Sequence, residues 1–113
     1  MAALELTETT HTLEMVTSTA EKVDYEASWV DITPAGDGSA TYDEGSAHGS
    51  ISAAADTTIV SAPAAGQRRR IVHLNVRNAG AGANVVTIQK DVSGTEYTMI
   101  GVSLAVGETL EYD

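Results

Sequence analysis

Residues 57–91 have the sequence TTIVSAPAAGQRRRIVHLNVRNAGAGANVVTIQKD. This stretch contains three runs rich in β-branched residues, separated by residues typical of turns. In a strand, successive side chains point to opposite faces, so the middle run divides into two sets. The first set is Val72, Leu74 and Val76, and the second set is Ile71, His73, Asn75 and Arg77. The stretch therefore predicts a core β-hairpin whose second set lies on a face that meets solvent or a partner.

Shorter strands are expected on both sides of this hairpin. In residues 22–33 the apolar side chains Val23 and Ala27 share a face with Trp29, and the phase then changes at Val30. A β-bulge or a second buried face would explain this change. Further strands are expected near residues 13–17, 50–55, 57–61, 95–102 and 108–112. Short strands with turn signals at regular spacing predict an all-β fold, either a small antiparallel β-sandwich or a barrel-like domain.

The 113 residues are enough for one small domain. Residues 1–12 are rich in Thr and Glu and are expected to form an extended N-terminal arm, followed by a single β-sandwich domain over residues 13–113. Residues 33–49 (TPAGDGSATYDEGSAHG) are dominated by turn formers, and they predict a long loop with one short edge strand near residues 39–42.

The expected core is thin, because the chain has one Trp, four Tyr and no Phe. Disulfides cannot support it, since there is no cysteine. A small domain with limited burial usually needs disulfides, a metal or association with neighbours. We therefore expect oligomerisation or docking on a larger assembly.

The negative charge lies in the first half of the chain. Residues 1–56 carry eleven acids and one lysine, whereas residues 57–113 carry five acids and five bases. Nucleic acid is not expected as a partner, because phosphates require a basic surface. The acidity either keeps the protein soluble or complements a basic surface on a partner. No apolar run approaches the length of a membrane span, and the N-terminus does not resemble a signal peptide, so a protein made in the cytoplasm and bound to no membrane is expected.

Arg68, Arg69 and Arg70 form a concentrated positive spot in this acidic chain. One interpretation is a solvated strand start or a set of ion partners for the acidic half. The other is a contact with an acidic surface on a partner or a neighbouring subunit. The candidate partner-interface residues are accordingly Arg68, Arg69, Arg70, Ile71, His73 and Arg77.

Catalysis and cofactor binding find no support in the sequence. The three histidines, His11, His48 and His73, lack a second histidine or an acid at a recognised metal-binding spacing. Gly80 and Gly82 lie between two expected strands, whereas a phosphate-binding loop would lead into a helix. No nucleophile, base and orienting group can be assembled. The protein is therefore not expected to be an enzyme or to hold a cofactor.

One alternative function uses the expected loop at residues 33–49. Asp37, Asp43 and Glu44 are candidate Ca²⁺ ligands there, although they lack the EF-hand spacing. A calcium- or carbohydrate-binding β module is therefore kept as an alternative.

Several short sequence segments of the chain occur together in one known pattern. They lie at residues 58–64 (TIVSAPA), 70–78 (RIVHLNVRN), 86–91 with 94–97 (VTIQKD and GTEY), 104–112 (LAVGETLEY) and 27–33 (ASWVDIT). The pattern resembles that of small structural proteins of tailed bacteriophages, and it covers most of the chain outside residues 34–50. The resemblance implies an all-β virion component without catalytic residues: a capsid decoration protein, a head fibre or a tail part.

From this resemblance we expect a capsid decoration (cement) protein that binds the major capsid protein on the outer surface of the virion, as a homotrimer. A thin core without disulfides fits a protein stabilised by its neighbours, and the arm at residues 1–12 would become ordered on binding. A tail, neck or fibre-base component is the alternative within the same class.

Overall fold

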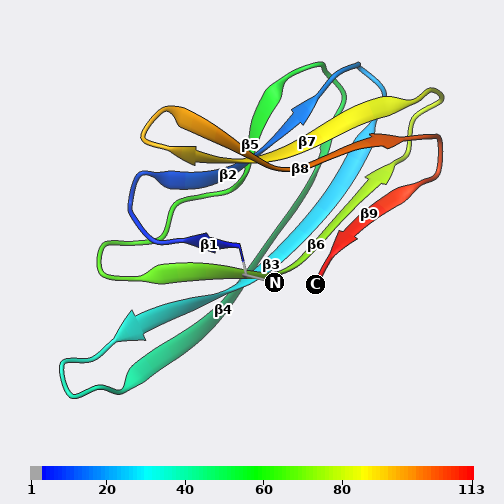
Figure 1. Ribbon diagram of the computed structural model, residues 1–113. Helices are drawn as coiled ribbons and strands as arrows, with labels where there is room; N and C mark the ends of the chain where they lie inside the picture. Colours follow the sequence, from blue (N-terminus) through cyan, green and yellow to red (C-terminus); the bar gives the residue numbers. More distant parts are fainter. Residues whose placement is uncertain (1–3) are drawn as a thin grey trace.

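The computed structural model describes residues 4–113, in which nine β-strands form two antiparallel sheets (Figure 1). The strands are β1 (Glu5–Leu6), β2 (His11–Thr17), β3 (Val23–Pro34), β4 (Ala40–Ile51), β5 (Asp56–Val60), β6 (Arg68–Asn78), β7 (Asn84–Val92), β8 (Thr95–Leu104) and β9 (Thr109–Tyr112). The larger sheet has the order β1-β6-β3-β4, with β9 also paired to β6, and the smaller sheet has the order β5-β2-β7-β8. This arrangement confirms the expected small all-β sandwich.

The core lies between the two sheets and is mainly aliphatic. Its members are Leu6, Leu13, Met15, Val23, Ala27, Trp29, Ile51, Ile59, Val60, Ile71, Leu74, Val76, Val86, Ile88 and Leu104. Most of them recur at every second position along a strand, as expected when one face of a sheet is buried. Each fully buried aliphatic side chain contributes about 1.5–3 kcal/mol relative to an exposed one. Aliphatic side chains from both sheets therefore supply most of the stabilisation that this small core provides.

Two buried asparagines close one end of the sandwich. Asn78 Nδ2 donates to the carbonyl oxygens of Gly82 (2.8 Å) and Leu104 (2.9 Å). Asn84 Oδ1 accepts a hydrogen bond from the Ser18 amide (3.0 Å), and its Nδ2 donates to the Glu21 carbonyl (3.0 Å). The β6–β7 connection is thus fixed by amide side chains, because buried polar groups must be hydrogen-bonded.

A β-bulge in β6 changes which side chains face the core. Ser28 of β3 lies opposite His73, but the next residue, Trp29, lies opposite Ile71. Val72 is therefore the extra residue, and it is 42% exposed while Ile71 is 1% exposed. The prediction that Ile71 lies on the outer face and Val72 in the core is wrong, because alternation does not continue across a bulge.

The prediction of a long loop at residues 33–49 is also wrong. Strands β3 and β4 pair without interruption from Val23 opposite Ile51 to Pro34 opposite Ala40. Only residues 35–39 connect them, with the Ala35 amide donating to the Ser39 carbonyl. Figure 1 shows that this hairpin extends beyond the rest of the sandwich.

Aromatic side chains of β3 explain why β4 contains glycine. A Cβ atom added to Gly45 would collide with the indole ring of Trp29, and one added to Gly49 would lie 2.9 Å from the Tyr25 hydroxyl oxygen. The rings reach across from β3 and occupy the places of these missing side chains. Glycine here marks close packing within a strand, not a loop.

The described part of the expected arm, residues 4–12, lies on the sandwich. In β1, Glu5 lies opposite Arg70 of β6, and Leu6 is buried in the core with 1% exposure. The amide of Leu4 donates to the hydroxyl of Tyr112 at 2.9 Å. Over these residues the chain therefore forms an edge of the larger sheet, and residues 1–3 of the expected arm lie outside the described residues.

Candidate functional site

Arg69 lies in a polar and aromatic cluster on the core-facing side of the larger sheet. Its guanidinium makes a two-point contact with Asp31 of β3, with 2.8 Å between Nε and Oδ1 and 3.1 Å between Nη2 and Oδ2. Nη1 donates to the carbonyl and hydroxyl oxygens of Ser61, both at 3.0 Å. The guanidinium carbon lies 4.5 Å from the centre of the Trp29 ring. Arg69 is therefore an internal ion partner of the acidic half, which is one of the two interpretations of the arginine triplet.

The other two arginines of the triplet point to the opposite side and share one carboxylate. Arg70 Nη2 lies 2.9 Å from Glu5 Oε1, and Arg68 Nη1 lies 4.0 Å from Glu5 Oε2. Both arginine side chains are 47% exposed. Exposed ion pairs of this kind contribute little to stability. They do, however, reduce the positive potential that the triplet shows to solvent.

The remaining interface candidates do not form one patch. His73 Nδ1 lies 2.7 Å from Asp113 Oδ1 near the C-terminus. Arg77 lines a shallow hollow with Asp24, Tyr25, Glu26, His48 and Asn75. Ile71 is in the core and is unavailable to a partner. The six predicted residues are thus divided between the core-facing and outer sides of β6.

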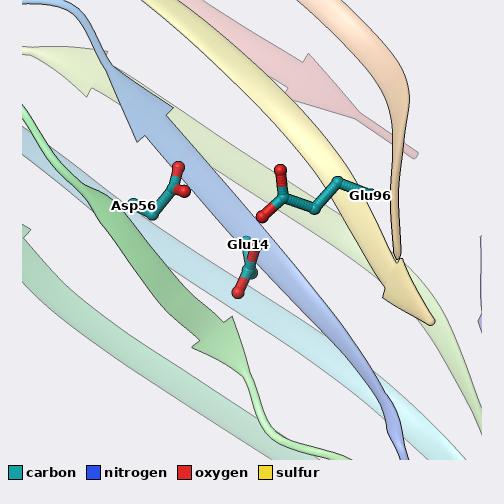
Figure 2. Close-up of side chains that lie close together, drawn as sticks. All are labelled: Glu14, Asp56 and Glu96. Atoms are coloured by element: carbon teal, nitrogen blue, oxygen red, sulfur yellow. The ribbon is translucent and has the colours of Figure 1, made fainter. Parts of the chain in front are cut away.

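Three carboxylates meet on the smaller sheet (Figure 2). Glu14 of β2, Asp56 of β5 and Glu96 of β8 have oxygen atoms that all lie within 4.8 Å of one another. Glu14 is half-buried, and its Oε1 accepts a hydrogen bond from Gln89 Nε2 at 2.9 Å. Oxygen ligands at such spacing are the kind that Ca²⁺ prefers. The residues are far apart in the sequence, so only the pairing of the strands reveals that they are neighbours.

Crowding of negative charge changes the titration of Glu96. Loss of hydration raises the pKa of its carboxyl, and the carboxylates of Asp56, Glu14 and Asp91 raise it further. A hydrogen bond with Gln89 acts in the opposite direction. The three acids of the cluster therefore repel one another when all are ionised.

The three acids that the sequence suggests as Ca²⁺ ligands, Asp37, Asp43 and Glu44, do not form a cluster. Asp37 Oδ1 accepts hydrogen bonds from the amide (3.0 Å) and hydroxyl (2.6 Å) of Ser39, and these bonds lower the pKa of Asp37. Asp43 and Glu44 are successive residues of β4, so their side chains point to opposite faces. The expected calcium site at residues 33–49 is therefore replaced by a turn and a strand.

An open apolar groove of about 580 Å³ lies between the edge of the smaller sheet and β1. Tyr97 and Met99 of β8 contribute exposed surface to it, at 52% and 43% exposure. Its other lining residues are Leu4, Glu5, Thr7, Lys90 and Val92. In the single chain these apolar side chains face solvent.

Comparison of the chain with protein-family models, with curated proteins and with solved structures gave no match. Among residues 4–113 there is no helix that is long and apolar enough to cross a membrane.

The first prediction concerns the Arg69 cluster. The side chains of Arg69 and Asp31 are only 12% and 15% exposed, so Arg69→Ala leaves a largely buried carboxylate unpaired and should lower the free energy of unfolding by about 3 kcal/mol. Arg68→Ala is the matched control, and it should change the free energy by less than about 0.5 kcal/mol. Urea denaturation measures both. Equal effects of the two substitutions would contradict the internal role of Arg69.

The second prediction concerns pH. Because the pKa of Glu96 is raised in the folded state, the group contributes stability below its unfolded pKa, and this contribution is lost as pH rises through the folded pKa. Glu96→Gln should therefore raise the melting temperature at pH 7, and the gain should disappear when the pH falls below the ordinary carboxyl range. Glu8→Gln, in the turn before β2, removes one charge outside the cluster and should not show this pattern. A melting temperature that falls at pH 7 in the Glu96 variant would contradict the prediction.

Proposed function

We propose that the protein is a structural virion component of a tailed bacteriophage. In this proposal it is a capsid decoration (cement) protein, which binds the major capsid protein on the outer surface and stabilises the particle. The phrases at residues 58–64 and 104–112, among others, support the class through their resemblance to small phage structural proteins. The all-β sandwich is the fold that this resemblance implies.

The observation that carries the proposal is uncompensated negative charge. The chain has a net charge of −10. Its own cations already have acidic partners at several positions: Lys22 with Asp24, Arg68 and Arg70 with Glu5, and Arg69 with Asp31. The acids in excess face solvent, where they are available to a partner with basic groups. This favours the interpretation that the acidity complements a partner.

The projecting end of the β3–β4 hairpin carries acidic side chains but no basic ones to balance them. Residues 32–67 contain no lysine and no arginine, and the hairpin extends from the sandwich toward solvent (Figure 1). Asp37 and Asp43 are exposed on it. A projecting acidic hairpin fits a contact with a basic capsid surface, and the exposed Tyr97 and Met99 add apolar surface of the kind found at protein contacts.

The expected homotrimer rests on the resemblance alone. Binding to the capsid does not depend on it.

The third prediction is the copy number. In purified virions, quantitative gel densitometry should find this protein at a copy number close to that of the major capsid protein. A handful of copies per particle would reject the decoration role and would favour the tail, neck or fibre-base alternative.

The same proposal has a second measurement on capsids that lack the protein. Binding in co-sedimentation should weaken as salt rises, because exposed charges are screened. Asp37→Asn combined with Asp43→Asn should weaken binding, whereas Glu111→Gln combined with Asp113→Asn removes the same charge elsewhere and should not. Equal binding by the two double variants would contradict a contact through the hairpin.

A further inference from the structure

Strand β4 is a long free edge of the larger sheet. It has 12 residues, and within residues 4–113 it pairs only with β3. Its outward N–H groups donate no hydrogen bond to another part of the described chain, and its outward carbonyl oxygens accept none. An edge of this kind is a template on which another strand can add by backbone hydrogen bonds.

Strand β4 lacks three of the features that commonly block an edge, although it carries the acids Asp43 and Glu44. The strand ATYDEGSAHGSI contains no lysine and no proline, and its register with β3 has no bulge. Side chains in its centre are small: Gly45, Ser46, Ala47 and Gly49. The glycines cannot become larger, since the Trp29 and Tyr25 rings occupy their space. A second strand can therefore approach the middle of β4 closely.

Symmetry restricts how β4 can pair with itself. Glu44, Ser46 and His48 point to the outer face, because the residues between them lie opposite the core-side residues Trp29 and Ala27 of β3. A two-fold axis perpendicular to the sheet keeps the core-facing sides of both copies on the same side. Outer residues must then lie opposite outer residues. Two registers satisfy this rule and still pair nearly the whole strand, one centred on Gly45 and one on Ser46.

Charge distinguishes these two registers. With Ser46 at the centre, Glu44 of each copy lies opposite His48 of the other copy, so the interface contains two complementary pairs. With Gly45 at the centre, His48 lies opposite Tyr42 and Glu44 lies opposite Ser46, so no acid faces a base. Centring on Glu44 itself would place two like charges opposite each other, which is destabilising. A ring N–H of His48 can donate a hydrogen bond to the Glu44 carboxylate only in the Ser46 register, so this register is preferred.

We propose that two copies of this chain associate by antiparallel pairing of their β4 strands, centred on Ser46, with Glu44 of each copy against His48 of the other. The two larger sheets then form one continuous sheet across the two-fold axis. This proposal does not rest on the proposed function, and it replaces the homotrimer expected from the resemblance with a dimer.

Sedimentation equilibrium of the full chain tests the stoichiometry. Because a single pair of strands forms a small interface, weak association is expected, and the protein concentrations should extend to the millimolar range. The buffer should contain about 0.15 M salt to screen the net charge. A reversible monomer–dimer equilibrium is expected. A protein that stays monomeric throughout, or that forms a trimer, would overturn the proposal.

A cysteine pair tests the register, and the chain has no other cysteine to interfere. Directly opposite residues of antiparallel strands have Cα atoms about 4.5–5.5 Å apart, within the range of a disulfide. S46C should therefore form a disulfide-linked dimer with oxidised glutathione, which accepts the two electrons. S50C is the matched control on the same face, and its two thiols would be separated by about 27 Å along the strand. S46C should cross-link roughly tenfold faster or more, and equal rates would refute the register.

Charge exchange tests the proposed pairs. H48E places acids opposite each other twice and should raise the dimer dissociation constant roughly tenfold. The double variant E44H/H48E restores both complementary pairs and should recover dimerisation, while H11E makes the same change of charge outside β4 and should leave dimerisation unchanged. Circular dichroism confirms that each variant is folded. Failure of the double variant to recover dimerisation would reject the Glu44–His48 contact.

Discussion

The pairing of β6 with β3, including the bulge at Val72, is the contact on which the rest of the structure depends. The bulge lets Ile71 and Leu74 both face the core, although they are three residues apart. It also determines which arginine turns inward. Because Arg69 points to the same side of β6 as Ile71, its guanidinium contacts Asp31 and Trp29 on the core-facing side of the sheet. In an unbroken strand, Arg68 and Arg70 would take that side instead, and burying two arginines there would be costly.

The outer side of the same strand follows from the same shift. Arg68 and Arg70 are left to face Glu5, which β1 brings alongside. The bulge thus gives all three arginines an acidic partner: Arg69 pairs with Asp31 on the core-facing side, and Arg68 and Arg70 pair with Glu5 on the outer side. The molecule that results shows mostly acidic groups to its surroundings, and this is why contacts with basic or self-complementary surfaces dominate its proposed roles.

Local patterns were sufficient to predict the strands of the second half. Alternation and β-branched residues predict β6 and β7, and turn residues predict where they end. The change of phase at Val30 predicts a bulge within residues 22–33 or a second buried face, whereas β3 pairs with β4 without a shift and the extra residue lies in β6. Its position in β6 depends on the register with β3, which no local pattern contains. Alternation along β6 therefore predicts the wrong face for Ile71.

The first half was harder to predict for two physical reasons. Gly45 and Gly49 are typical of loops when considered alone, but here they make room for Trp29 and Tyr25 of the neighbouring strand. The carboxylate cluster of Glu14, Asp56 and Glu96 arises because three strands from distant parts of the chain meet in one sheet. Both features depend on which strands lie side by side, so they can be recognised only when the pairing of the strands is known.

Nuclear Overhauser effects between β3 and β6 test the role of the bulge most directly. The structure predicts cross-strand contacts between Ser28 and His73 and between Trp29 and Ile71, with no β3 residue opposite Val72. It also predicts contacts from the Ile71 methyl groups to core side chains of the smaller sheet. A spectrum with Trp29 opposite Val72 and with solvent-exposed Ile71 methyl groups would contradict this role.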